Sequence, residues 1–349
     1  MEYCSSNPII TAADAQRLSA GKLKVIGAFN PGAAQFNGKT VLLVRVAEQF
    51  EPETGCMEIP IAKDGGVTRL KIAKDGRYDF GDPRVIAGRK GEKYLTSLSK
   101  LLVAQSDDGV NFSFTGNGII PQGGYEAFGA EDPRITFIDG AYYITYTAVS
   151  AMGVCVALAR TSDFVSFERL GIILPPDNKD AVLFPEKIGG KYYMLHRPSA
   201  SEFARPEMWI AESEDLIRWG NHRRLCGVRD GWDCARIGAG PAPVKTKDGW
   251  LTVYHGADED NRYCMGALLL DPQKPWIVRK RSEKPFMEPV NGYETDGFFG
   301  GAVFSCGMIA SGDKLRIYYG AADDKICLAY ADTDEITAGM SDVAGGTDN

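Results

Sequence analysis

The chain is dominated by short runs in which apolar and polar residues alternate, and most of these runs follow a glycine-containing turn. A period of two places every second side chain on the same face, which is the pattern of half-buried β-strands. Helical periodicity is almost absent. One short helix is expected from Thr11 to about Leu18, with Thr11 as its N-cap. The pattern therefore predicts an all-β protein.

The strand pattern repeats along the chain. A glycine turn leads into an alternating apolar strand five times, at Gly38 to Arg45, Gly140 to Thr147, Gly190 to Arg197, Gly249 to His255 and Asp313 to Tyr319. A second motif, Ala-x-Ser/Thr-x-Asp with an aromatic residue four positions after the Asp, occurs around Asp108, Asp163 and Asp215. Such repetition predicts about five four-stranded sheets arranged radially, which is a five-bladed β-propeller.

The predicted domain organisation has an arm, a body, an insertion and a tail. Residues 1–24 form the N-terminal arm and residues 25–337 form the propeller. Residues 51–93 interrupt the first unit with weak alternation, so we expect a lid-like hairpin over the mouth of the channel. Residues 338–349 are small and polar with two adjacent glycines, and we expect a disordered tail.

The most distinctive stretch, Glu131-Asp132-Pro133-Arg134, directly precedes a predicted hairpin with the turn Asp139-Gly140. Neighbouring side chains on an extended strand point in opposite directions, so we expect only one of the two acids, Asp132, to face a pocket. A similar stretch, Gly81-Asp82-Pro83-Arg84, is not followed by a strand in the repeat register, and we prefer the second copy. The structural alternative is that Asp132 only caps a turn.

The repeat register also aligns polar residues. The ends of the five glycine-led strands are Arg45, Thr147, Arg197, His255 and Tyr319. Equivalent positions in a propeller surround the central channel, so we expect these side chains to converge on one polar pocket. In the same register Asn30 is the counterpart of Asp132. The alternative is that strand ends are polar for structural reasons alone.

Composition narrows the class of protein. A chain of 349 residues with 44% hydrophobic residues can bury a large core, and a formal charge of -7 argues against nucleic acid or an anionic membrane as the main partner. The beginning of the chain lacks a signal sequence and no apolar run is long enough to span a bilayer, so we expect a cytoplasmic protein. The eight cysteines lack Cys-x-x-Cys spacing, which predicts reduced core thiols without a disulfide or a metal site.

The residues around Asp132 favour a sugar ligand together with an anion. Glycoside hydrolysis usually needs two carboxylates, but here one carboxylate stands out and cations accumulate instead. These cations are Lys179, Arg197, Arg236 and His255. Together they would form an anion cradle, in which phosphate replaces water as the nucleophile.

Ordered motifs over nearly the whole chain resemble glycoside hydrolase family 130, the mannoside phosphorylases. They include Phe29-Asn30-Pro31-Gly32, Leu43-Val44-Arg45, Glu131-Asp132-Pro133-Arg134, Leu183-Phe184-Pro185-Glu186-Lys187, Ile237-Gly238-Ala239-Gly240, Tyr254-His255-Gly256 and Tyr319-Gly320-Ala321-Ala322-Asp323. The resemblance implies a five-bladed propeller that cleaves β-mannosides with phosphate and inverts the anomeric centre to give α-mannose 1-phosphate. We expect inorganic phosphate as co-substrate and no metal or organic cofactor.

The resemblance also implies roles for single residues. Asp132 matches the general acid, which acts through a mannose hydroxyl that relays the proton to the glycosidic oxygen. The phosphate ligands match Lys179, Arg197, Arg236 and His255, although the family more often has Arg at the first of these positions and Lys at the third. The expected substrate-binding residues are Asn30, Arg45, Glu131, Arg134, Asp180 and Asp323.

Two other functions remain open at this point. A β-mannosidase or arabinanase-like hydrolase would use a second carboxylate such as Asp180, Glu186 or Asp323 and would release free sugar without phosphate. A non-catalytic carbohydrate-binding propeller would bind sugar and form no product. We favour the phosphorylase, with β-1,2-linked before β-1,4-linked mannooligosaccharides, because residues 25–30 resemble the β-1,2 branch. A homo-oligomer is compatible with the sequence.

Overall fold

The computed structural model describes residues 1–19, 23–51, 55–199 and 202–343. Strands dominate, and the helices are short: α1 (Ala12–Gln16), the 3-10 helix η1 (Gly124–Glu126), α2 (Gly292–Thr295) and α3 (Thr333–Ala338). Thr11 precedes α1, and its backbone N–H and hydroxyl both donate to the Asp14 carboxylate, at 2.8 and 2.9 Å. The all-β class and the short helix after Thr11 are confirmed.

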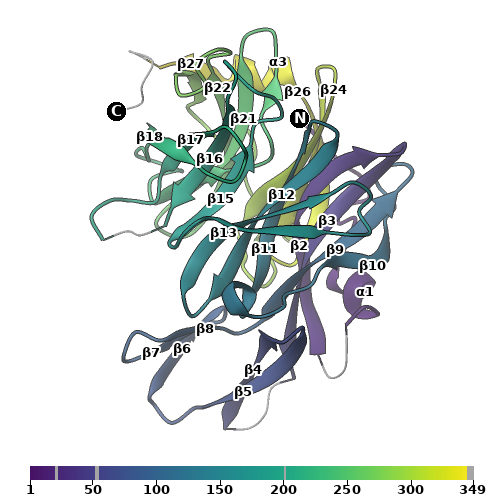
Figure 1. Ribbon diagram of the computed structural model, residues 1–349, viewed down its shortest axis with the longest axis vertical. Coiled ribbons are helices and arrows are strands. Elements are labelled where there is room, and N and C mark those ends of the chain that lie inside the picture. Colours follow the sequence, from purple (N-terminus) through teal and green to yellow (C-terminus); the bar gives the residue numbers. More distant parts are fainter. Residues whose placement is uncertain (20–22, 52–54, 200–201, 344–349) are drawn as a thin grey trace.

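The strands of the described chain gather in antiparallel groups (Figure 1). The first group is β2 (Leu23–Phe36), β3 (Lys39–Phe50), β9 (Leu98–Ser106) and β10 (Ser113–Ile119). The second is β11 (Gly129–Ile138), β12 (Ala141–Ser150), β13 (Gly153–Thr161) and β14 (Glu168–Leu174). A parallel contact between Gly129 and Ser99 joins these two groups into one sheet.

The remaining groups follow in chain order. The third is β15 (Asn178–Leu183), β16 (Tyr192–Pro198), β17 (Met208–Ser213) and β18 (Gly220–Cys226). The fourth is β19 (Arg236–Ala239) and β20 (Val244–Lys245), which both pair with β21 (Trp250–Ala257), followed by β22 (Tyr263–Leu270) and β23 (Val278–Ser282). The fifth is β24 (Val303–Ser311), β25 (Lys314–Ala321) and β26 (Lys325–Asp332), with β1 (Glu2–Tyr3) on its outer edge.

The five predicted glycine-led strands are all present, as β3, β12, β16, β21 and β25, and each pairs with the strand that precedes it. The repeated Ala-x-Ser/Thr-x-Asp motif closes the next strand. Asp108, Asp163 and Asp215 each accept two backbone N–H groups from the residues that follow, at 2.8 or 2.9 Å. The motif is therefore a turn cap that recurs with the fold.

Apolar side chains fill the space between neighbouring groups. Leu43 of β3 and Ile144 of β12 belong to one buried cluster, and Leu195 of β16 and Trp250 of β21 belong to another. Each sheet is thus packed against its neighbours, which fixes the relative positions of the polar residues on adjacent strands.

Register shifts in the first strands of three groups redirect polar side chains. Asn30 in β2, Asp132 in β11 and Asp180 in β15 lie at these shifts with positive φ angles of 47°, 49° and 52°. Asn and Asp tolerate the left-handed conformation better than most residues, and a β-bulge changes the direction of a side chain. Asn30 is thereby confirmed as the counterpart of Asp132.

The insertion carries strands of its own, at the foot of Figure 1. A hairpin comes first, formed by β4 (Cys56–Lys63) and β5 (Gly66–Ala73). A small sheet follows, formed by β6 (Tyr78–Asp82), β7 (Val85–Gly88) and β8 (Lys93–Leu95). Residues 52–54 of the predicted insertion lie outside the described residues.

The C-terminal residues differ from the prediction. β27 (Met340–Asp342) pairs with β23, the Met340 side chain is buried, and the Val343 backbone N–H donates to the Arg279 carbonyl at 2.9 Å. Disorder from residue 338 is therefore wrong for residues 338–343, because the edge of a neighbouring sheet offers hydrogen-bond partners that composition does not reveal. The rest of the predicted tail, residues 344–349, lies outside the described residues.

The described residues also bear on the cysteines and on membranes and metals. The eight cysteines all lie within the described residues and form no disulfide, and Cys155, Cys264, Cys306 and Cys327 are buried as expected. In the described ranges, every helix is too short or too polar to cross a bilayer. The same ranges contain no group of three or more His, Cys, Asp or Glu side chains that could hold a metal ion.

Candidate active site

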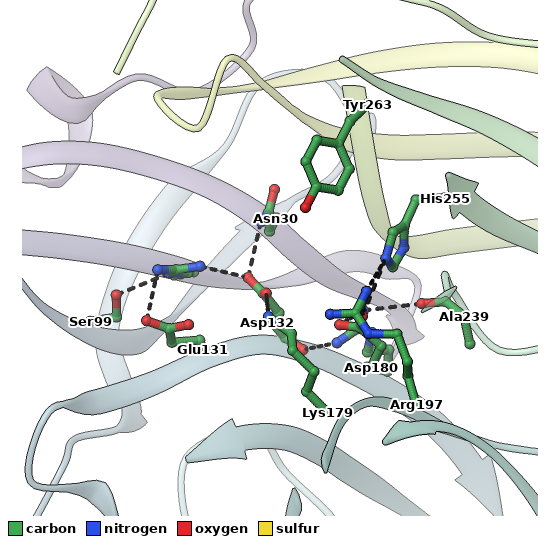
Figure 2. A network of polar contacts seen from close by, with 12 residues as sticks. Asn30, Ser99, Glu131, Asp132, Lys179, Asp180, Arg197, Ala239, His255 and Tyr263 are labelled. Atoms are coloured by element: carbon green, nitrogen blue, oxygen red, sulfur yellow. Dashed lines mark hydrogen bonds and ion pairs between the residues drawn. The ribbon is translucent and has the colours of Figure 1, made fainter. Parts of the chain in front are cut away.

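Asp132 lies at the centre of a network of buried polar contacts (Figure 2). Its Oδ1 accepts hydrogen bonds from Asn30 Nδ2 and Arg45 Nη1, both at 2.9 Å. Its Oδ2 lies 3.9 Å from the Lys179 ammonium group. Asn30, Asp132 and Lys179 come from the first strands of three different groups. The repeat register predicted that Asn30 is the counterpart of Asp132, and Lys179 was predicted as a phosphate ligand.

Glu131 faces the same cavity as Asp132, contrary to expectation. The Arg45 guanidinium binds Asp132 through Nη1 and Glu131 through Nη2, at 2.9 and 2.8 Å, and both acids line the cavity. The prediction that the two side chains point apart is wrong here. The register shift between Glu131 and Arg134 and the positive φ of Asp132 interrupt the strand alternation.

The acids of the cavity have different pKa values. Burial alone would raise the pKa of Asp132, but the positive charges of Arg45 and Lys179 outweigh it and lower the pKa to about 2. Burial raises the pKa of Glu131 above its usual range, and Arg45 only partly opposes this. Burial also raises the pKa of Asp323, which lines the same cavity, to about 6. Asp132 is therefore ionised at neutral pH, whereas Asp323 titrates close to neutrality.

Arg197 and His255 lie next to Lys179 and share the Asp180 carboxylate (Figure 2). Lys179 and Arg197 are paired across β15 and β16. Asp180 Oδ2 lies 2.8 Å from Arg197 Nη1 and 3.2 Å from His255 Nε2. Burial lowers the pKa of His255 to about 4, although the Asp180 carboxylate acts in the opposite direction. Three of the four predicted phosphate ligands are therefore neighbours.

The fourth, Arg236, is directed toward Tyr263. Its Nε donates to the Tyr263 hydroxyl at 2.7 Å, its Nη2 contacts the Asn261 side chain, and its guanidinium lies 4.9 Å from the centre of the Tyr263 ring. The Tyr263 ring in turn lies 6.0 Å from the His255 ring. Arg236 is thus connected to His255 indirectly, because Tyr263 contacts both side chains.

Arg134 and Asp180, expected among the substrate ligands, are fully buried, and among the described residues neither lines the cavity. Arg134 donates to the carbonyl oxygens of Asp132 and Ala239, at 2.9 and 3.1 Å, and its Nη2 lies 3.2 Å from Asp180 Oδ1. These contacts link the backbone under Asp132 to the cation cluster.

Of the five strand-end residues, Arg45 is the one that lines the described cavity. Arg197 and His255 are buried outside the cavity lining in contact with Asp180, and the other two lie apart from them. Tyr319 is buried and donates its hydroxyl to Glu294 Oε1 at 2.7 Å. It lies on the core face of β25 together with Leu315 and Ile317. Thr147 is buried as well, and the described cavity lining contains neither residue. Convergence of all five side chains is therefore wrong, because an equivalent strand position does not fix which face a side chain occupies where bulges differ.

The cavity of about 230 Å³ has an aromatic wall. Its rings belong to Phe29, Tyr263, Phe298, Phe299 and Phe304. The insertion contributes Arg84, whose guanidinium lies 4.2 Å from the centre of the Phe299 ring and pairs with Asp82 at 2.9 Å. Arg84 and the phenylalanines between β23 and β25 were not predicted as site residues from the sequence. The signal for Arg84 was the match of residues 81–84 to residues 131–134.

An all-β fold whose cavity combines carboxylates, guanidinium groups and aromatic rings is typical of proteins that bind and process sugars. Comparison with known proteins makes this class specific. The model of glycoside hydrolase family 130, described as β-1,4-mannooligosaccharide phosphorylase, matches residues 82–341. The chain belongs to this family.

Individual relatives support the same assignment. A β-1,2-mannobiose phosphorylase of Listeria innocua is 47% identical over 91% of this chain and 92% of its own length. The solved structure of a β-1,2-mannobiose phosphorylase from Listeria innocua in complex with β-1,2-mannobiose has a TM-score of 0.94 at 43% identity and covers 97% of this chain and 98% of its own. A β-1,4-mannooligosaccharide phosphorylase of Ruminococcus albus is 35% identical over 59% of this chain and 63% of its own length.

Proposed function

We propose that the protein is a glycoside phosphorylase, which cleaves β-mannosides with inorganic phosphate, inverts the anomeric centre and releases α-D-mannose 1-phosphate in a reversible reaction. The observation that carries the proposal is the placement of Asp132 next to Lys179, with Arg197 on the adjacent strand and His255 joined to them through Asp180. A sugar alone does not require two neighbouring cations, Lys179 and Arg197, beside a neutral imidazole, whereas such a group suits a phosphate nucleophile. The names of the relatives agree with this reaction.

In this proposal the two sides of the site hold different ligands. Lys179, Arg197 and His255 bind phosphate, and Arg236 adds positive charge from beside Tyr263. Asn30, Arg45, Glu131 and Asp323 bind the hydroxyls of one mannose unit. The buried Nε of Arg197 and Nδ1 of His255 have no hydrogen-bond partner among the described residues, which favours an oxygen-rich ligand at this position.

The reaction is a single displacement. A phosphate oxygen attacks the anomeric carbon from the cation side while the glycosidic bond breaks on the opposite face. The departing oxygen takes a proton from a mannose hydroxyl, and that hydroxyl takes one from Asp132. Inorganic phosphate is the co-substrate, and these steps involve no other cofactor.

The low pKa of Asp132 links phosphate binding to acid catalysis. A cation about 6 Å away stabilises the ionised carboxylate by about 3 kcal/mol at an effective dielectric constant of 20, which is about two pKa units. Bound phosphate offsets much of this charge, so we expect phosphate to raise the pKa of Asp132. Titration of the carboxylate by carbon-13 NMR with and without phosphate measures this, and identical titration curves would contradict it.

The favoured substrates are β-1,2-linked mannooligosaccharides. This preference rests on the 47% identity and the TM-score of 0.94 to β-1,2-mannobiose phosphorylases, against 35% identity to a β-1,4-mannooligosaccharide phosphorylase. The test is incubation with β-1,2- and β-1,4-mannobiose, each with and without phosphate, while mannose 1-phosphate and free mannose are measured. Phosphate-dependent mannose 1-phosphate from the β-1,2 disaccharide is expected. Free mannose without phosphate would identify a hydrolase instead, and no product under any condition would identify a binding protein.

The finer architecture belongs to the same proposal. The antiparallel groups of four or more strands in the described residues, with β1 paired to β26, support a five-bladed β-propeller closed by both ends of the chain. In it, residues 25–337 are the catalytic body and residues 51–93 cover the channel mouth. The cytoplasmic location and the homo-oligomer stay predictions from the sequence.

A further inference from the structure

Asp180 occupies an unusual place next to the cation cluster. It follows Lys179 on β15, where the register shift and a φ of 52° turn the two side chains to different places. The Lys179 side chain lines the cavity. The Asp180 side chain is 0% exposed and lies beneath it, between β11, β16 and β21.

The Asp180 carboxylate connects three basic side chains of three different strands. Its Oδ1 lies 3.2 Å from Arg134 Nη2. Its Oδ2 lies 2.8 Å from Arg197 Nη1 and 3.2 Å from His255 Nε2, and these two nitrogens are 3.3 Å apart. Each partner is itself nine-tenths or more buried. Without the carboxylate, two buried guanidinium groups and an imidazole would face one another without compensation.

The backbone opposite Asp180 is shaped for this contact. A Cβ atom at Gly238 would lie 2.5 Å from Asp180 Oδ2 and 2.7 Å from the His255 ring. Only glycine at this position leaves room for the carboxylate and the imidazole to meet. A side chain on β19 at residue 238 would push them apart.

The contacts with Asp180 leave one nitrogen free on each of two basic partners. Nε of Arg197 and Nδ1 of His255 are buried and have no hydrogen-bond partner among the described residues. The Arg197 Nε–H is a buried donor, and leaving it without an acceptor is costly, so it is expected to meet a ligand oxygen. With the His255 Nε2–H directed at Asp180, Nδ1 of the neutral imidazole is an acceptor and can receive the hydrogen of a protonated phosphate oxygen. The Asp180 contact fixes the rotation of both side chains and therefore the direction of both free nitrogens.

We propose that Asp180 is a positioning residue for phosphate: it holds Arg197 and His255 in the orientation that receives the oxyanion, and it does not contact the sugar. This inference rests on the proposed function and replaces the expectation that Asp180 binds substrate. It also argues against Asp180 as the second carboxylate of a hydrolase, because the side chain is fully buried and is not part of the described cavity lining.

The test compares Asp180→Asn with Glu126→Gln in the full-length protein. Asparagine keeps the shape of the side chain and removes its charge. Glu126 is a matched control, since it is a buried carboxylate that binds Arg169 and Tyr146 away from the cavity lining. Steady-state kinetics with β-1,2-mannobiose give separate KM values for phosphate and disaccharide, and the shift of the melting temperature by inorganic phosphate alone gives binding without catalysis.

We expect Asp180→Asn to raise the KM for phosphate about 10- to 100-fold, the range found when a supporting partner of a ligand-binding side chain is removed. The KM for mannobiose should change by less than about 3-fold, which is below that range. The phosphate-induced rise in melting temperature should be lost. Glu126→Gln should retain the phosphate KM and the phosphate-induced shift of the wild-type protein.

Gly238→Ala tests the same contact without changing any charge. This variant replaces Asp180→Asn in the test if Asp180→Asn does not fold. It should weaken phosphate binding selectively as well. Equal phosphate binding in wild type and variants, or a larger rise in the KM for mannobiose than for phosphate, overturns the positioning role. If the wild-type protein binds phosphate but releases free mannose in its absence, the proposed function is wrong. The positioning role is then judged separately, by comparing the phosphate-induced shift of the melting temperature in wild type and variants.

Discussion

The same tripeptide, Asp-Pro-Arg, occurs twice in this protein and performs opposite tasks. In the copy at residues 132–134, the acid faces the cavity and the arginine is buried with 1% of its side chain exposed. In the copy at residues 82–84, the arginine lines the cavity, and the acid, 40% exposed, holds it through two hydrogen bonds at 3.1 and 2.9 Å.

The difference lies in the backbone that carries each copy. Residues 132–134 lie within β11 at a bulge and are buried. Residues 82–84 lead from β6 through a tight turn into β7 in the insertion, where Asp82 is paired with Val85. A carboxylate in a buried bulge needs positively charged partners from other strands, whereas a carboxylate at an exposed turn binds the arginine of its own turn. The motif therefore indicates an acid–arginine geometry, and the surrounding sheet decides which of the two residues reaches a ligand.

The largest expected effect separates the two acids. Asp132→Asn should lower kcat/KM for phosphorolysis of β-1,2-mannobiose by about 10²- to 10⁴-fold, the usual contribution of a general acid. Asp82→Asn should lower it by less than about 10-fold, because Asp82 only holds Arg84. Both variants should keep the phosphate-induced rise in melting temperature. Similar losses in the two variants would show that the sequence motif, and not the bulge, determines the role.

The two arginines should differ in stability. Arg134→Ala leaves Asp180 with one fewer buried partner and frees two buried carbonyl oxygens, so we expect a loss of about 3 to 5 kcal/mol in the free energy of unfolding. Arg84→Ala should cost less than about 1 kcal/mol, since its pair with Asp82 is largely exposed. Urea denaturation of both variants measures this difference. Equal destabilisation would argue against a structural role for Arg134.

Asp323 lines the same cavity as Asp132 of one copy and Arg84 of the other. Burial raises its folded pKa to about 6, above about 3.9 in the unfolded chain. Its contribution to stability is therefore fully present below about pH 4 and is lost as the pH rises through 6. Relative to Asp323→Asn, the wild-type protein should lose up to about 3 kcal/mol between pH 4 and pH 7.

Asp82→Asn provides the control for this measurement. The hydrogen bond from Arg84 lowers the pKa of Asp82, so its contribution is lost as the pH falls, in the opposite direction. Urea denaturation at several pH values measures both variants. A pH-independent difference between wild type and Asp323→Asn would contradict the raised pKa.

Much of this arrangement could be predicted from the sequence, because strand alternation and turn residues are local signals. The five glycine-led strands and the equivalence of Asn30 and Asp132 follow from the repeat register alone. Glu131 was assigned to the wrong face, since a bulge depends on hydrogen bonds to the next strand that one strand does not reveal.

Other parts of the site depend on contacts between distant segments. Arg84 reaches the cavity because its segment folds back to Phe299, and no local pattern indicates that contact. Arg236 carries the expected charge, but its direction is set by Tyr263, 27 residues away. Strand β27 was missed for the same reason, because its partner β23 lies about 60 residues earlier in the chain by the pairing of Lys280 with Asp342. Sequence patterns thus located the candidate ligands better than they located their orientation.

The smallest expected effect concerns Arg84, the residue that the comparison of the two copies brings into the site. Its planar guanidinium covers the Phe299 ring, and such a contact contributes about 0.5 to 1 kcal/mol at a partly exposed position. Arg84→Ala should therefore raise the KM for β-1,2-mannobiose about 2- to 5-fold and leave the KM for phosphate unchanged. Arg84→Lys keeps the charge but loses the flat stacking surface, so it should resemble the alanine variant if stacking matters and the wild type if charge matters. Steady-state kinetics with each substrate varied separately distinguish these outcomes. A fall in kcat as large as that of Asp132→Asn would instead show that Arg84 takes part in general acid catalysis. The two copies of the tripeptide would then not differ in the way described above.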